Sequence, residues 1–82
     1  MENKVVTLTN KANESIYLYC TKVYEGIDGF IVLELDKEKN PDSLLAYMEV
    51  ADTYSARYMY NQENRVVILG VYPEMITEIS AQ

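Results

Sequence analysis

The chain has 82 residues, of which 49% are hydrophobic and 24% are charged. This length suits one domain covering residues 1–82, and this composition excludes an intrinsically disordered chain. Thirteen acidic residues against seven basic ones give a formal net charge of −6, which disfavours direct binding to DNA or RNA and favours a protein partner with a basic surface.

The N-terminal segment begins Met1-Glu2-Asn3-Lys4 and continues as a short alternating stretch. It lacks the basic region and the long apolar region of a secretory signal peptide. No window of the chain approaches the ~18 apolar residues of a membrane span. We therefore expect a cytoplasmic protein that makes no contact with a membrane.

Three segments in the first half alternate apolar and polar residues, which predicts β-strands over residues 4–9, 15–25 and 30–36. In the second strand, one side carries Ile16, Leu18 and Cys20, and the other carries Tyr17, Tyr19 and Thr21. The connection Gly26-Ile27-Asp28-Gly29 supplies residues that tolerate a positive φ. The second and third strands are thus predicted to form a hairpin.

A helix is predicted to begin after residues 37–39, where Asn40 suits the N-cap, Pro41 the first helical position and Asp42 the positive end of the helix dipole. From residue 44 to residue 59 the hydrophobic period is close to 3.6. One stripe of this predicted helix holds Leu44, Tyr47, Met48, Ala51, Tyr54, Tyr58 and Met59. The alternative is that residues 56–60 form a strand paired with residues 65–71.

Residues 65–72 are apolar at nearly every position, which is typical of a central strand. Residues 74–80 fit a short helix or an edge strand, and the spacing of Met75, Ile76 and Ile79 slightly favours the helix. The predicted fold class is α+β, with a small, mainly antiparallel sheet in the order β-β-β-α-β. One amphipathic helix packs on one face of this sheet, followed by a short C-terminal helix or strand.

Catalytic and metal-binding chemistry has little support in this composition. Histidine is absent, and the single cysteine, Cys20, lies in a strand where it is expected to be a buried core thiol. Glu34 and Asp36 are two residues apart on one strand face, roughly 7 Å, which suits a divalent cation or an acid–base pair. A solvated strand face explains the same pair, so we expect no enzyme activity, no metal and no cofactor.

Tyrosine is unusually frequent, with eight tyrosines against one phenylalanine and no tryptophan. Tyr17 and Tyr19 face away from the predicted core, and Tyr60 falls on the polar side of the predicted helix. Exposed tyrosines are effective interface anchors because they combine a large area with few rotatable bonds and a hydroxyl. The only arginines, Arg57 and Arg65, suit either an anion clamp or surface ion pairs.

These features predict a non-catalytic binding protein that docks an acidic, tyrosine-bearing surface onto a larger macromolecule. The residues expected to take part are Tyr17, Tyr19, Tyr60, Glu34, Asp36, Asp42, Arg57 and Arg65. By analogy with small acidic proteins of phages and mobile elements, inhibition of a host enzyme is one such role. Mimicry of nucleic acid is one version of it, with a patch of acidic residues close in sequence: Glu25, Asp28, Glu34, Asp36, Glu38 and Asp42. The alternative is a homo-oligomer that is structural or that sequesters a small anion or nucleotide.

Overall fold

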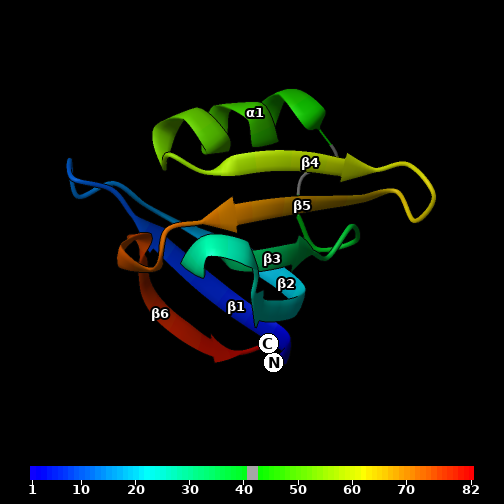
Figure 1. The fold of residues 1–82 in the computed structure, drawn as a ribbon, viewed down its shortest axis with the longest axis horizontal. Helices are drawn as coiled ribbons and strands as arrows, with labels where there is room; N and C mark the ends of the chain where they lie inside the picture. The colour runs from blue at the N-terminus through cyan, green and yellow to red at the C-terminus, as the bar shows by residue number, and fades with distance from the viewer. Residues whose placement is uncertain (41–42) are drawn as a thin grey trace.

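Alternation of apolar and polar residues governs most of the fold. A computed structural model describes residues 1–40 and 43–82 of the chain (Figure 1). Its elements are β1 (Glu2–Thr9), β2 (Ser15–Glu25), β3 (Ile31–Leu35), α1 (Leu44–Thr53), β4 (Arg57–Asn61), β5 (Val66–Val71) and β6 (Ile76–Ala81). The strands form a six-stranded sheet in the order β4-β5-β3-β2-β1-β6, and all neighbouring strands are antiparallel. The prediction of a mainly antiparallel sheet with one helix is confirmed.

The predicted hairpin of β2 and β3 is confirmed, and its connection uses the residues expected. Asp28 and Gly29 have φ angles of 58° and 78°, a region that Gly and Asp tolerate better than most residues. The amide of Gly26 donates a hydrogen bond of 2.8 Å to the carbonyl of Phe30, which closes the hairpin. A register shift between Cys20 and Lys22 changes the alternation of β2, so that Val23 rather than Lys22 is buried.

One face of the sheet, here called the inner face, forms the hydrophobic core together with α1. Its strand residues include Val6, Leu8, Leu18, Cys20, Val23, Leu33, Leu35, Val67, Leu69 and Val71, all buried. From α1 and the turn that follows it, Tyr47 and Tyr54 complete this core. The opposite, outer face carries the alternate residues of the same strands, including Tyr17 and Tyr19 as expected.

The start of α1 differs from the prediction. Ser43 is the N-cap, and its hydroxyl accepts a hydrogen bond of 3.3 Å from the amide of Ala46. The prediction that Asn40 caps the helix is wrong, because the side chain of Asn40 forms hydrogen bonds with Tyr19 and Asp36 instead. The predicted roles of Pro41 and Asp42 lie outside the described residues.

The predicted helix over residues 44–59 is wrong beyond Thr53, because a left-handed residue stops it. Ser55 has a φ of 53°, and the amide of Ala56 donates 2.8 Å to the carbonyl of Ala51, the long-range bond of a Schellman motif. After this stop the chain forms β4, whose Tyr58 lies opposite Leu69 of β5. The alternative prediction of a strand near residues 56–60 is therefore confirmed.

The C-terminal segment is an edge strand, so the preference for a helix over residues 74–80 is wrong. A short 3-10 turn at Pro73–Met75 redirects the chain, and β6 then pairs with β1. The two termini lie side by side (Figure 1), where the amide of Gln82 donates 3.0 Å to the carbonyl of Asn3. β6 is held by backbone pairing with β1 and little by burial of its side chains. Of its six residues, Ile76 is half-buried and the others are exposed.

Asn40 ties the end of β3 to β2 through its side chain. Its Nδ2 donates to the carbonyls of Tyr19 at 2.7 Å and Asp36 at 2.8 Å, and its Oδ1 accepts from the amide of Tyr19 at 3.0 Å. The residue is only 8% exposed, so water cannot readily replace these bonds. Asn40 therefore acts as one extra rung of the sheet beyond Leu35.

We predict that Asn40→Ala lowers the free energy of unfolding by about 1–3 kcal/mol, because the amide of Tyr19 loses its acceptor in a part-buried setting. Urea denaturation followed by circular dichroism measures this change. Asn64→Ala, at an exposed turn position, is the matched control and should change stability little. Equal midpoints for the two variants would contradict the role of Asn40.

Candidate functional site

The outer face of the sheet carries the largest group of exposed aromatic residues. Tyr17, Tyr19, Tyr24 and Tyr72 are 70%, 39%, 45% and 42% exposed. Antiparallel pairing places two of them beside apolar residues of the neighbouring strand, since Tyr19 lies opposite Val5 and Tyr24 lies opposite Val32. This surface, here called the tyrosine face, comprises Tyr17, Tyr19, Tyr24, Met59 and Tyr72 with the half-buried Val5, Val32 and Ile68.

Neighbouring side chains hold part of the tyrosine face in place. The hydroxyl of Tyr24 donates a hydrogen bond of 3.0 Å to a carboxylate oxygen of Glu34. Burial raises the pKa of Tyr24, and the adjacent Glu34 adds to this rise, so the hydroxyl keeps its proton at neutral pH. At one end, the rings of Phe30 and Tyr72 lie 4.7 Å apart, and the guanidinium of Arg57 lies 4.5 Å above Phe30. Fixed side chains lose less entropy when they enter an interface.

Charges on the outer face nearly cancel, in contrast to the whole chain. The strand register gives it two bases, Lys22 and Arg57, and two acids, Glu34 and Glu78. Glu2 lies opposite Lys22 at the margin. Most of the excess of six negative charges therefore lies elsewhere on the molecule.

A second exposed surface lies on α1. Leu44, Leu45 and Met48 are 49%, 76% and 52% exposed, and the exposed Glu49 and Asp52 follow within the next turn. These five residues are here called the acidic helix face. The helix Leu44–Thr53 contains no lysine or arginine. At ~100° per residue, Leu45 points away from the buried side of the helix.

Leu44 and Met48 were predicted to join the buried stripe of the helix, and this prediction is wrong. The predicted stripe was centred with the help of Tyr58 and Met59, which belong to β4. Without them, Tyr47, with 6% exposure, and Tyr54, with 3%, set the buried side.

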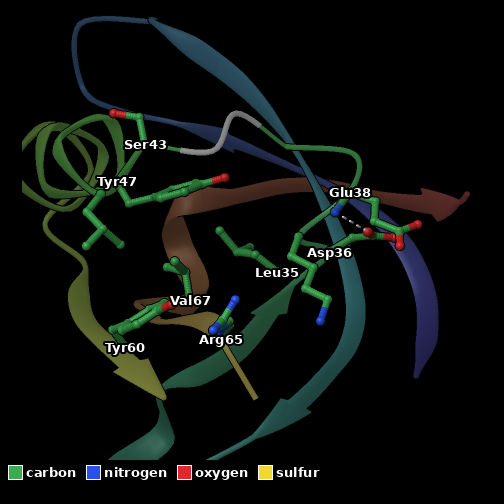
Figure 2. Close-up of a pocket in the computed structure, with 10 residues that line it drawn as sticks. Leu35, Asp36, Glu38, Ser43, Tyr47, Tyr60, Arg65 and Val67 are labelled. Atoms are coloured by element: carbon green, nitrogen blue, oxygen red, sulfur yellow. Dashed lines mark hydrogen bonds between the residues drawn. The ribbon is translucent and has the colours of Figure 1, made fainter. Parts of the chain in front are cut away.

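Between α1 and the loop after β3 lies a pocket of about 580 Å³ (Figure 2). Leu35 and Val67 form its apolar floor, and Tyr47 and Tyr60 reach it from α1 and β4. The charged residues that line it are two bases, Arg65 and Lys37, and two acids, Asp36 and Glu38. Because these charges balance, the pocket offers no net attraction for an anion.

The residues singled out by sequence divide between these places. Tyr17, Tyr19, Glu34 and Arg57 lie on the outer face, whereas Tyr60, Asp36 and Arg65 line the pocket. Tyr60 is thus on a strand, with its side chain half-buried, and not on the surface of a helix. Asp42 lies outside the described residues.

The acids proposed for mimicry of nucleic acid do not form one row. Asp28 precedes β3 and Asp36 follows it, so the five-residue strand, roughly 16 Å long, separates them. Asp36 lies beyond the end of the strand and accepts a hydrogen bond of 2.9 Å from the amide of Glu38. The expected pairing of Glu34 and Asp36 on one strand face is therefore interrupted.

Sequence reasoning missed Tyr24, Tyr72 and Leu45. The register shift in β2 hid the face to which Tyr24 belongs, because simple alternation from Tyr19 places residue 24 on the buried side. Tyr72 was read as the end of a central strand, although the position after the buried Val71 alternates onto the outer face. For Leu45, the available signal was its place outside the predicted apolar stripe of the helix.

Among residues 1–40 and 43–82, no group of three or more His, Cys, Asp or Glu side chains could hold a metal ion. In the same part of the chain, no helix has the length and apolar character needed to cross a membrane. No protein-family model, curated protein or solved structure matches the chain significantly.

Cys20 is fully buried on the inner face, where its thiol lies 3.6 Å from the carbonyl of Leu18. Burial raises the pKa of this thiol to about 12. Because only the thiolate is nucleophilic, Cys20 is a packing residue in the native protein.

We predict that iodoacetamide does not alkylate Cys20 in the native protein at neutral pH and labels it fully in denaturant. The rate of labelling, followed by intact mass, should rise with urea in parallel with the unfolded fraction, because both the raised pKa and the lack of access require unfolding. Rapid labelling without denaturant would contradict this assignment.

Proposed function

We propose that this chain is a non-catalytic binding protein that docks onto a larger protein through the acidic helix face. The observation that carries the proposal is the exposure of Leu44, Leu45 and Met48 on a helix whose only charged residues are Glu49 and Asp52. Exposed apolar residues in adjoining positions of a folded domain typically mark an interaction site.

The spacing on α1 matches helix-in-groove recognition. Leu44 and Met48 are four residues apart, so they lie one above the other on the same side, and Leu45 lies beside them. A short amphipathic helix binds an apolar groove through such anchors. Glu49 and Asp52 then favour a groove with lysine or arginine at its rim, in keeping with the acidic charge of the whole chain.

The acidic residues and the exposed tyrosines, which were predicted to share one surface, lie on different surfaces. The acids expected to attract a basic partner accompany Leu45 on α1, whereas the tyrosines lie on a sheet face whose charges nearly cancel. Attraction of a basic protein is therefore assigned to α1. Inhibition of a host enzyme by a protein of a phage or mobile element is one role that such docking serves.

The balanced charges around the pocket argue against sequestration of a small anion as the main role. Arg65 would draw an anion in, but Asp36 lines the same pocket and opposes it. Docking of a protein groove with a basic rim onto α1 meets no such electrostatic opposition, because the helix carries no lysine or arginine.

Leu45→Ala should weaken binding to the partner by at least tenfold, about 1.4 kcal/mol, because it removes the most exposed anchor of the helix. The partner is first captured from the producing cell with the tagged full chain, identified by native mass spectrometry, purified, and titrated at two salt concentrations. Binding should weaken as salt rises, since the attraction joins acids to a basic rim.

Ile27→Ala is the matched control, because Ile27 is an apolar residue with 83% exposure in the β2–β3 connection, away from α1. It should bind as the unaltered protein does. Equal affinity of the Leu45→Ala variant, or affinity that does not change with salt, would refute docking through α1.

A further inference from the structure

The tyrosine face presents apolar area on the scale of a subunit interface. Its four tyrosines together expose the equivalent of about two whole side chains, roughly 300–500 Å². Met59, with 59% exposure, and the half-buried Val5, Val32 and Ile68 extend this area. The total approaches the ~600 Å² per partner that marks the lower limit of specific, stable interfaces.

The near-balance of charge on the tyrosine face favours a second copy of this chain over a strongly charged partner. Two molecules that each carry a formal charge of −6 repel one another when their acidic surfaces approach. The outer face is largely spared this repulsion because Lys22 and Arg57 offset Glu34 and Glu78, which leaves Glu2 at the margin as its one acid without a matching base. A strongly basic partner gains nothing from this face, whereas an identical face brings both signs and equal apolar area.

The form of the surface also suits pairing with itself. It is one side of an antiparallel sheet, and two such sides pack face to face at about 10 Å. At one end of this side, Gly70 has no side chain, and the side chains of Arg57 and Phe30 flank it, with the guanidinium 4.5 Å from the ring centroid. Tyr24, held by Glu34, supplies a fixed aromatic contact near the middle of the sheet.

We propose that the tyrosine face is the interface of a symmetric homodimer, in which two sheets pack face to face about a two-fold axis. The contact is isologous, so each tyrosine meets the same surface on the second copy. The acidic helix face belongs to the opposite side of the sheet and stays exposed in this dimer. Each dimer therefore carries two helix faces, which point away from the interface.

The test is sedimentation equilibrium of the purified full chain over a wide range of concentration, with no other protein present. The unaltered chain should reach the mass of a dimer. Tyr17→Glu combined with Met59→Glu should raise the dissociation constant by more than about a hundredfold, because it places like charges opposite one another in the interface. Both residues are mainly exposed, so the far-ultraviolet circular dichroism and urea midpoint should stay unchanged.

The control is Leu45→Glu combined with Met48→Glu, which adds the same charge at similar exposure on the other side of the molecule. It should leave the dimer intact. Dimerisation should also strengthen as salt rises, because salt screens the repulsion between acidic subunits, and this is the opposite of the trend expected for the partner of α1.

A monomer at every concentration would overturn the proposal. So would a dimer that resists the Tyr17/Met59 substitutions but dissociates on Leu45→Glu with Met48→Glu. Dissociation on Ile79→Pro would also overturn it, because the amide of Ile79 faces the free edge of β6, where a proline blocks pairing between strands. None of these measurements involves the partner of α1, so the dimer and the docking proposal fail independently.

Discussion

A sheet has two faces, and the described part of this chain has one helix to cover them. The inner face is sealed by α1 and the tyrosines around it, with Leu33 and Leu69 completely buried at the centre. The chain uses its remaining residues for edge strands and turns, so the outer face is left with solvent as its neighbour. Tyrosine suits such a place because its ring extends the sheet surface while its hydroxyl remains hydrated. The exposure of the tyrosine face follows from this shortage of covering elements.

Charge then separates the two exposed surfaces. Like-charged copies of a small acidic protein stay apart unless one surface is close to neutral, and the outer face meets that condition. The acids next to Leu45 on α1 have the opposite effect, since they favour a basic partner and disfavour self-association. In the account proposed here, one side of the sheet joins two copies and the other side presents helices outward. Two helices on one assembly would also raise the avidity for a partner with repeated or paired sites.

The strands were predictable where local alternation and tertiary burial agree. Ile16, Leu18 and Cys20 alternate with Tyr17 and Tyr19, and both sets lie on the faces that alternation indicates. Beyond Cys20 the register shift removes this agreement, because one added residue moves every following side chain to the other face. A bulge depends on contacts with a neighbouring strand, and no local pattern marks it.

Long-range and conformational effects explain the other errors. Residues 54–59 have a helical period, but Ser55 adopts a left-handed conformation that the sequence does not demand, and pairing with β5 then outweighs the period. Asparagine is a common helix cap, yet the side chain of Asn40 forms hydrogen bonds with the backbone of Tyr19, which lies 21 residues away in the sequence. The residues of the candidate surfaces likewise divide into those that a local pattern reveals and those that only the folded structure reveals. Tyr17 was found from alternation alone, whereas the exposure of Leu44 and Met48 became visible only when the true length of α1 fixed its buried side.

The central claim is that the outer face is covered by a second copy while the acidic helix face remains open. Nuclear magnetic resonance with a soluble paramagnetic agent tests this directly, by comparing the relaxation of side-chain protons at low and high protein concentration. The account predicts that Tyr17, Tyr19 and Met59 become protected as concentration rises, while Leu45 stays accessible throughout. Tyrosines that remain fully accessible at high concentration, or protection that appears at Leu45 instead, would contradict it.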